Sequence, residues 1–247
     1  MEPMKIAVVG ATGTLGRPVA AALEARGHEV RKLSRRSPSY PTDLTTGVGL
    51  QDALSDVDVV INASNGPATR ARAQQAVLVD GTRRLLEATA AHHVCVSIVG
   101  IESIPIGYYG VKLAQEAAVA TSGRPFTIVR ATQFNSLFGT ALLKLARRRI
   151  ELRSSARFQP VDVTEVATAV ADAAERAPLH GTTTIAGPEV LTLTQMRAGH
   201  GLPLPLPLPP TIGRALRSGG LTIADPDVRG SITYAQWLAL TRAASPP

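Results

Sequence analysis

Short apolar runs alternate along the chain with alanine-rich segments whose composition is typical of helices. The runs are too short to form helices, and they lack alternating polar positions, as is typical of strands buried on both faces. We expect strands at residues 6–9, 28–33, 57–61, 94–99, 126–129 and 182–186, and helices at residues 19–26, 73–91, 111–120 and 166–176. This order predicts an α/β fold, a Rossmann-like doubly wound parallel sheet with helices on both faces.

The composition changes toward the C-terminus, where residues 202–210 read Leu-Pro-Leu-Pro-Leu-Pro-Leu-Pro-Pro. Because proline removes a backbone donor, this stretch predicts an extended connector and neither a helix nor a central strand. The residues that follow carry enough apolar side chains, Trp237 among them, to form a small lobe. We expect one NAD(P)-binding domain over residues 1–247, with a core at about 4–190 and a C-terminal substrate lobe at about 191–247.

Three glycines follow the first predicted strand at a spacing typical of a dinucleotide-binding turn. Gly10 would permit the tight turn, Gly13 would let the backbone approach a pyrophosphate, and Gly16 would let the next helix pack close to the strand. That helix would direct its N–H groups and its positive dipole end at the phosphates. The alternative is an ordinary glycine-rich turn. We expect cofactor contacts from the turn residues Gly10, Thr12, Gly13, Thr14, Leu15 and Gly16.

The turn after the second predicted strand favours NADP(H) over NAD(H). NAD sites usually carry a carboxylate there, whereas this turn reads Ser34-Arg35-Arg36. Guanidinium groups and a hydroxyl match a 2′-phosphate, although a solvated basic turn is the alternative. Asn62 and Ala63 follow the next strand, where Asn62 either contacts the cofactor or forms a turn.

Tyr108 and Lys112 are four residues apart, which places them on one face of a helix that begins by Tyr108. A nearby ammonium stabilises phenolate and lowers the pKa of a phenol from its usual value of about 10. We expect Tyr108 to protonate a carbonyl oxygen as hydride arrives at its carbon, and Lys112 to hold the nicotinamide ribose. The alternatives are a structural tyrosine with a solvated lysine, or Tyr109 as the acid if the helix register differs by one residue.

The chain resembles the short-chain dehydrogenase/reductase superfamily in several motifs. These are the glycine motif at residues 10–16, the Tyr108 and Lys112 pair, residues 160–167 and the Ala-Thr-Gln-Phe sequence after Arg130. It is most similar to the atypical NmrA-like NAD(P)-binding branch, over residues 4–190. That branch contains both reductases and non-catalytic NADP sensors. The resemblance implies a catalytic serine where this chain has Val99.

Two serines near that position are candidates for the missing hydroxyl. Ser97 is expected to face the cofactor, and Ser103 to substitute from the following loop. The loop after Arg130 is expected to supply Ala131 and Gln133 to the cofactor, and Phe134 and Asn135 to the substrate. Alternatively, Asn135 caps a helix that starts near residue 136, and Phe134 is a core contact.

The composition of the chain limits the kinds of partner that we expect it to bind. The net charge of +7 comes from arginine clusters without neighbouring aromatic residues, and aromatic residues make up 4% of the chain, so we expect no nucleic-acid partner. No apolar stretch approaches the roughly 18 residues needed to span a bilayer, and the N-terminus lacks a signal-peptide pattern. A single Cys95 excludes an internal disulfide, no spacing indicates a metal site, and His92 and His93 are expected in a surface turn.

The sequence therefore predicts a cytoplasmic, bacterial-type, NADPH-dependent oxidoreductase that reduces the carbonyl group or conjugated enone of a small apolar substrate. The first alternative is a non-catalytic NADP(H)-binding redox sensor. The second is a cofactor-using isomerase or epimerase of secondary metabolism. A homodimer is compatible with all three classes, and no sequence feature selects an oligomeric state.

Overall fold

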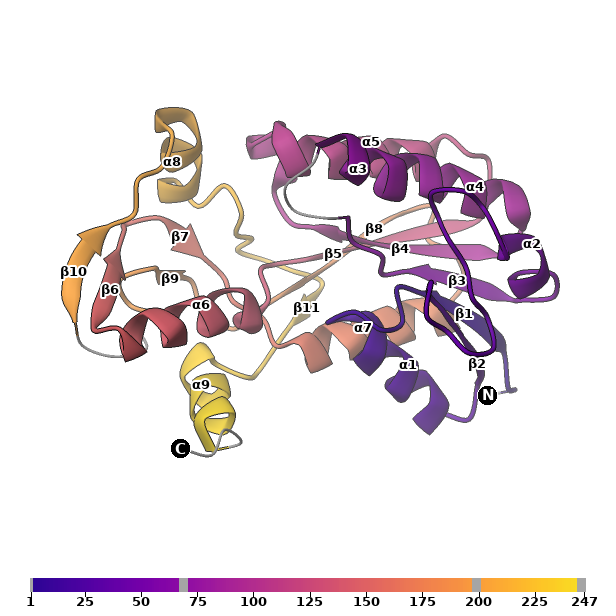
Figure 1. The fold of residues 1–247 in the computed structure, drawn as a ribbon, viewed down its shortest axis with the longest axis horizontal. Helices are drawn as coiled ribbons and strands as arrows, with labels where there is room; N and C mark the ends of the chain where they lie inside the picture. Colours follow the sequence, from indigo (N-terminus) through magenta and orange to yellow (C-terminus); the bar gives the residue numbers. More distant parts are fainter. Residues whose placement is uncertain (1, 67–70, 197–200, 244–247) are drawn as a thin grey trace. The chain divides into compact units, whose positions relative to one another are not determined.

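The computed structural model describes residues 2–66, 71–196 and 201–243 (Figure 1). These residues contain a seven-stranded sheet with the strand order β11-β8-β5-β4-β3-β1-β2. The pairs of β1 with β2, β1 with β3, β3 with β4 and β8 with β11 are parallel. The predicted Rossmann-like α/β fold is confirmed. The chain divides into two compact units, which are described separately.

The first unit comprises Met1–Ser97, Pro105–Arg130 and Val166–Thr183. Its strands are β1 (Lys5–Val9), β2 (Glu29–Leu33), β3 (Val59–Asn62), β4 (His92–Ile98), β5 (Phe126–Ala131) and β8 (Gly181–Ala186). Its helices are α1 (Gly16–Ala25), α2 (Leu50–Ala53), α3 (Ala71–Gln75), the π-helix η1 (Ala76–Asp80), α4 (Gly81–Ala88), α5 (Gly107–Ala120) and α7 (Val163–Glu175). Strands β4, β5 and β8 and helix α7 each have one end in the second unit. In Figure 1, α1 and α7 lie on one face of the sheet and α4 and α5 on the other.

The second unit comprises Ile98–Ile104, Ala131–Glu165 and Thr184–Pro247. It contains the short 3-10 helix η2 (Ile101–Ser103) and the helices α6 (Asn135–Arg147), α8 (Pro210–Arg217) and α9 (Tyr234–Ala243). Its strands are β6 (Ile150–Arg153), β7 (Arg157–Phe158), β9 (Leu191–Thr192), β10 (Leu202–Pro205) and β11 (Val228–Arg229). Strand β10 pairs with β6, and β7 pairs with β9.

The register of the first unit brings three strand ends to one edge of the sheet. Val9 lies beside Leu33 on one side and beside Asn62 on the other. The turns that follow β1, β2 and β3 therefore meet at the carboxyl edge, where ligands of open α/β sheets bind. All four residues of β3 are buried, as the absence of polar alternation predicts.

The helical pattern of residues 73–91 is not one continuous helix. It is divided into α3, η1 and α4, and the π-helix is closed by a hydrogen bond from the Gly81 N–H to the Ala76 carbonyl. Periodicity alone does not predict such a wide turn, because the apolar positions still lie on one side of the element. The expectation of an unbroken helix here is wrong.

The proline-rich stretch is only partly a connector. Leu202–Pro205 form β10, and α8 begins at Pro210. The Leu202 N–H donates to the Arg149 carbonyl and the Leu206 N–H donates to the Arg153 carbonyl. The prolines occupy the intervening positions, where an edge strand needs no donor toward its partner.

His92 and His93 are buried in β4, so the expected surface turn is wrong. The His92 ring lies 2.9 Å from the Thr127 hydroxyl, and His93 is 3% exposed. Burial lowers the pKa of His93 to about 4. Two polar residues at a helix-to-strand junction are typical of a turn, but here they continue the buried strand.

This burial predicts an acid-sensitive stability. The unfolded histidine binds a proton near pH 6.5, so between about pH 6.5 and 4 the unfolded chain takes up a proton that the folded chain excludes. The free energy of unfolding should fall by on the order of 2 to 3 kcal/mol as the pH falls through that window. Urea denaturation of the wild type and of His93→Leu at several pH values measures the difference. Parallel pH profiles would contradict this expectation.

No helix in the described part of the chain is long and apolar enough to cross a bilayer. The same residues contain no group of three or more His, Cys, Asp or Glu side chains placed to hold a metal ion.

Candidate nucleotide and catalytic site

The glycine turn between β1 and α1 has the conformation that its spacing predicts. Gly10 has a φ of +78°, and a Cβ there would lie 2.9 Å from the Ala63 carbonyl oxygen. A Cβ on Gly16 would lie 2.2 Å from the Gly10 carbonyl oxygen, so α1 packs directly on the turn. A Cβ on Gly13 would meet only that same oxygen, at 3.1 Å, and Gly13 is exposed. The turn is therefore tight on its inner side and open at Gly13.

Helix α1 begins at this turn without a cap. Its N-cap residue Leu15 forms no side-chain hydrogen bond, and the first turn carries no acidic residue. Thr12 and Thr14 are exposed. The positive end of the helix dipole is thus not neutralised by a side chain of the first turn, which favours an anion at this place.

Ser34, Arg35 and Arg36 follow β2 at the same edge, since the Gly10 N–H donates to the Leu33 carbonyl over 3.1 Å. Both arginines are exposed. The Ser34 hydroxyl is buried and has no hydrogen-bond partner. The pKa of Asp43 is lowered, first by hydrogen bonds from Thr45 and further by the charge of Arg35.

Asn62 forms a turn, one of the two roles left open by the sequence. Its Oδ1 accepts hydrogen bonds from the Ser64 N–H at 3.2 Å and from the Ser64 hydroxyl at 2.6 Å. Its Nδ2 donates to the Thr82 hydroxyl at 3.0 Å. The Ala63 N–H donates to the Val9 carbonyl, which fixes this turn beside β1.

Tyr108 lies in the first turn of α5, so the helix does begin early enough to align it with Lys112. The Tyr108 hydroxyl donates to Asn65 Oδ1 over 3.0 Å. Burial, and then the neighbouring Tyr109, raise the pKa of Tyr108 to about 12. Burial also raises the pKa of Tyr109. The expected lowering of the Tyr108 pKa is therefore wrong.

Lys112 explains that difference because its ammonium is directed into the core. Its Nζ donates to the Val96 carbonyl and to Gln115 Oε1, each over 2.6 Å. The residue is 4% exposed, and burial lowers its pKa. The alternative of a solvated lysine is wrong. Spacing on one helix face does not determine which groups the long side chain reaches.

Ser97 is buried in β4, and its hydroxyl has no hydrogen-bond partner. Val99 is 4% exposed, and its N–H donates to the Ala131 carbonyl in the second unit. Ser103, in η2, is exposed. The position where the resemblance implied a catalytic serine thus holds a buried aliphatic side chain.

The loop after β5 is held by internal bonds of the second unit. Gln133 donates through Nε2 to the Leu221 carbonyl, and its Oε1 accepts from the Gln159 N–H. Asn135 is 1% exposed, and neither its Oδ1 nor its Nδ2 has a partner. The capping role is wrong for Asn135, because α6 already begins at this residue and the half-buried Phe134 is its N-cap.

Comparisons with known proteins agree with this geometry. Residues 6–103 match the family model described as the NAD dependent epimerase/dehydratase family. The dTDP-6-deoxy-L-talose 4-dehydrogenase (NAD(P)(+)) of Kitasatospora kifunensis is 38% identical over 102 residues, which cover 36% of this chain and 32% of that protein. The match thus spans about a third of the length of that relative.

Two solved structures share the fold over nearly the whole chain. A short-chain dehydrogenase/reductase superfamily protein from Agrobacterium tumefaciens with bound NAD has a TM-score of 0.74 at 18% identity, over 97% of this chain and 96% of its own. An NADPH-dependent quinone oxidoreductase from Escherichia coli, complexed with NADPH, has a TM-score of 0.74 at 18% identity, over 96% and 99%. The chain thus has the fold of these two proteins, and its residues 6–103 are similar to the NAD dependent epimerase/dehydratase family. Its membership of the short-chain dehydrogenase/reductase superfamily and of the NmrA-like branch stays a prediction.

Two buried residues bonded to Lys112 and Asn62 were not among the site residues expected from the sequence. Gln115 is fully buried on α5, and Thr82 is 2% exposed on α4. The three-residue spacing between Lys112 and Gln115 is a signal that was available in the sequence, since such residues share a helix face. No comparable pattern pointed to Thr82.

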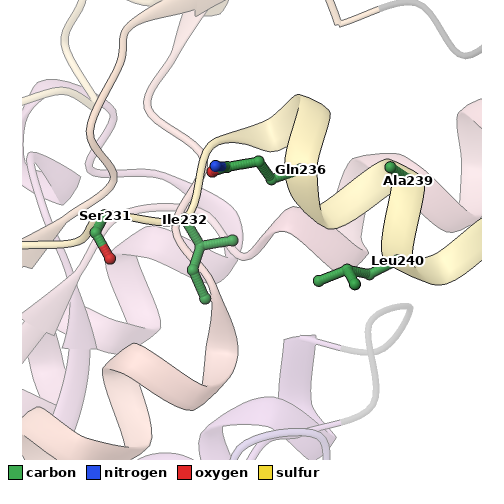
Figure 2. Close-up of a pocket in the computed structure, with 5 residues that line it drawn as sticks. All are labelled: Ser231, Ile232, Gln236, Ala239 and Leu240. Carbon is green, nitrogen blue, oxygen red and sulfur yellow. The ribbon is translucent and has the colours of Figure 1, made fainter.

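Figure 2 shows a hollow beside α9 in the second unit. It is lined by Ser231, Ile232, Gln236, Ala239 and Leu240. Glu165 Oε1 accepts hydrogen bonds from the N–H groups of Ser231 and Ile232, which fixes one rim. None of the residues predicted to act lines this hollow, so it carries no part of the catalytic argument.

Proposed function

We propose that the protein is an NADP(H)-dependent oxidoreductase that reduces the carbonyl group or conjugated enone of a small apolar substrate. The observation that carries the proposal is the carboxyl edge of the first unit. There an open glycine turn and an uncapped helix lie beside Ser34 and two exposed arginines. The dehydrogenase and the quinone oxidoreductase named above support the reaction class.

The residues at this edge fit the cofactor. The inner faces of Gly10 and Gly16 have no room for a Cβ, and the exposed Gly13 leaves space for a pyrophosphate. The partnerless Ser34 hydroxyl and the arginines Arg35 and Arg36 would bind the 2′-phosphate. Val96 and Gln115 occupy two of the three protons of the Lys112 ammonium, and the third would serve the nicotinamide ribose.

NADPH, when bound, supplies a hydride to the substrate carbon. Tyr108 holds its proton throughout the neutral range, because its pKa is raised to about 12. It donates that proton to the carbonyl oxygen as negative charge develops there, which completes the reduction to an alcohol. Asn65 orients the hydroxyl before substrate enters, by accepting its hydrogen bond.

Arg35→Ala is expected to weaken NADPH binding about 10- to 100-fold, the loss of one or two charge-assisted hydrogen bonds. Affinity for NADH should stay within about twofold, since NADH has no 2′-phosphate. Calorimetric titration of the wild type and the variant with both nucleotides measures this. Arg176→Ala is the matched control, because this exposed arginine follows α7 at the opposite edge of the sheet. Equal losses of affinity for NADH and NADPH would show that Arg35 acts through its positive charge in general and does not bind the 2′-phosphate.

The second candidate function, an alternative to the first, is that of a non-catalytic sensor of the NADP(H) redox state. The raised pKa of Tyr108 favours it, because an acid with a pKa near 12 transfers its proton poorly at neutral pH. A sensor would distinguish NADP from NADPH in binding and would oxidise no NADPH with apolar quinones or diketones. An isomerase or epimerase, the third class, would retain its cofactor tightly and also consume no NADPH.

A further inference from the structure

A chain of buried polar side chains runs from Lys112 to the turn after β3. The Lys112 ammonium donates to Gln115 Oε1 over 2.6 Å, and Gln115 Nε2 donates to the Thr82 hydroxyl over 3.0 Å. Asn62 Nδ2 donates to the same hydroxyl, also over 3.0 Å. All four residues are at most 4% exposed. Buried groups in such a chain are costly to leave unpaired, so each one constrains the next.

The ammonium fixes the direction of the first two bonds in this chain. An ammonium only donates, so Gln115 must turn its oxygen toward Lys112 and its NH2 toward Thr82. Asn62 presents its NH2 to Thr82, because Ser64 occupies its oxygen. The Thr82 hydroxyl therefore accepts two hydrogen bonds and donates its only proton to the Leu78 carbonyl. Its full capacity is used.

The π-helix supplies that last acceptor. Leu78 lies in η1, which packs against α5. The Thr82 hydroxyl reaches back to the carbonyl four residues earlier, a hydrogen bond that threonine side chains also form within helices. Single π-turns are rare and concentrate at functional sites.

The other end of the chain lies under the nucleotide cradle. The Gly10 backbone packs on the turn after β3, since a Cβ on Gly10 would lie 2.9 Å from the Ala63 oxygen and 3.0 Å from the Ser64 Cα. Ser64 in turn donates to Asn62. The cradle floor and the Lys112 ammonium are thus connected by four side chains without an exposed link.

We propose that Gln115 and Thr82 are positioning residues, which hold the Lys112 ammonium at a fixed place beside Val96 and tie it to the turn beneath the glycine cradle. The role in the reaction rests on the proposed function, whereas the positioning itself does not. The other groups that act electrostatically on Lys112 are Cys95 of β4 and Glu116 of α5, and both favour its charged form. Burial opposes that charge, so the acceptor on Gln115 helps to keep Lys112 protonated.

Lysine NMR tests the positioning without any nucleotide or substrate. The chain has only four lysines, Lys5, Lys32, Lys112 and Lys144, so selective labelling of Cε and Nζ gives four signals. Gln115→Met, which keeps the volume and removes the acceptor, is expected to lower the measured pKa of Lys112 by about one unit, a tenfold change in proton affinity. Thr82→Val should act in the same direction, and Thr82→Ser should restore the wild-type value.

Thr127→Val is the matched control. Thr127 is 1% exposed, and its hydroxyl bonds to His92 and the Leu179 N–H, away from this chain. The proposal is overturned if Lys112 titrates within about 0.3 units of the wild type in folded Gln115→Met and Thr82→Val. If Gln115→Met does not fold, the Lys112 pKa measured in Thr82→Val and Thr82→Ser decides whether the proposal holds.

Turnover of NADPH with menadione tests the role in the reaction. Gln115→Met should lower kcat about tenfold while the KM for NADPH rises by less than about threefold, because the substitution displaces the ammonium from the nicotinamide ribose and leaves the contacts of the glycine turn and the 2′-phosphate site in place. A shifted Lys112 pKa with unchanged kcat would overturn that role alone. Failure of the wild type to bind NADPH would refute the proposed function, and the NMR result would still decide the positioning.

Discussion

Gly16→Ala is expected to abolish measurable NADPH binding and to lower the free energy of unfolding by about 3 kcal/mol. The new Cβ would lie 2.2 Å from the Gly10 oxygen and 2.7 Å from the Gly10 carbonyl carbon, so backbone must move. Moving α1 away from the turn separates its N-terminus from the phosphates. We expect the Kd for NADPH to rise at least about 100-fold. Calorimetry and urea denaturation measure the two effects.

Substitutions at two other glycines distinguish the effect of a new Cβ on packing from its effect on the approach of the nucleotide. Gly13→Ala meets only one atom, at 3.1 Å, so it should fold nearly as stably as the wild type and yet weaken NADPH binding. Gly27 has a φ of +86°, and a Cβ there would meet nothing within 4 Å. Gly27→Ala should therefore cost about 1 kcal/mol of backbone strain and leave the affinity for NADPH unchanged. Wild-type NADPH affinity in Gly16→Ala would show that the turn is not a nucleotide cradle.

Tyr108→Phe is expected to lower kcat for quinone or diketone reduction by about 10²- to 10⁴-fold, the usual contribution of a general acid. NADPH affinity should remain within about twofold, because the hydroxyl is bonded to Asn65 and lies outside the glycine turn. Steady-state kinetics and calorimetry on the same preparation test both parts.

Tyr109→Phe is the matched control, since Tyr109 adjoins Tyr108 with ring centroids 5.9 Å apart. It should keep most of the activity. Because the pKa of Tyr108 is raised to about 12, its deprotonation should cause no decline in kcat between about pH 7 and 10. Activity lost in Tyr109→Phe and kept in Tyr108→Phe would move the acid to Tyr109.

The part of the site that local backbone chemistry determines was predictable from the sequence. Gly10 requires a positive φ, and Gly16 requires close packing, whatever the rest of the fold does. The buried strands of a parallel sheet followed from apolar runs without polar alternation. The alignment of Tyr108 with Lys112 followed from the helical repeat once α5 was placed.

The parts that depend on distant neighbours were not predictable. The pKa of Tyr108 is raised because the side chain is buried. Lys112 bonds to Val96 and Gln115, a choice that a flexible side chain makes only in the folded core. Capping was the alternative role for Asn135, but α6 begins at this residue and its N-cap is Phe134. The interruption at η1 of the helix predicted at residues 73–91 cannot be detected from periodicity, since a single wide turn preserves the buried side.

Strand β10 has a consequence for how this protein behaves at high concentration. In a parallel pair, the N–H and C=O groups of one residue point to the same side of the strand. The backbone groups of the leucines of β10 therefore point toward β6, and those of the prolines point away from it. The outer edge of β10 therefore offers carbonyl oxygens and no donors. A strand from another molecule would find half of its hydrogen-bonding groups unmatched there, so the leucine and proline alternation closes this small sheet against edge-to-edge aggregation.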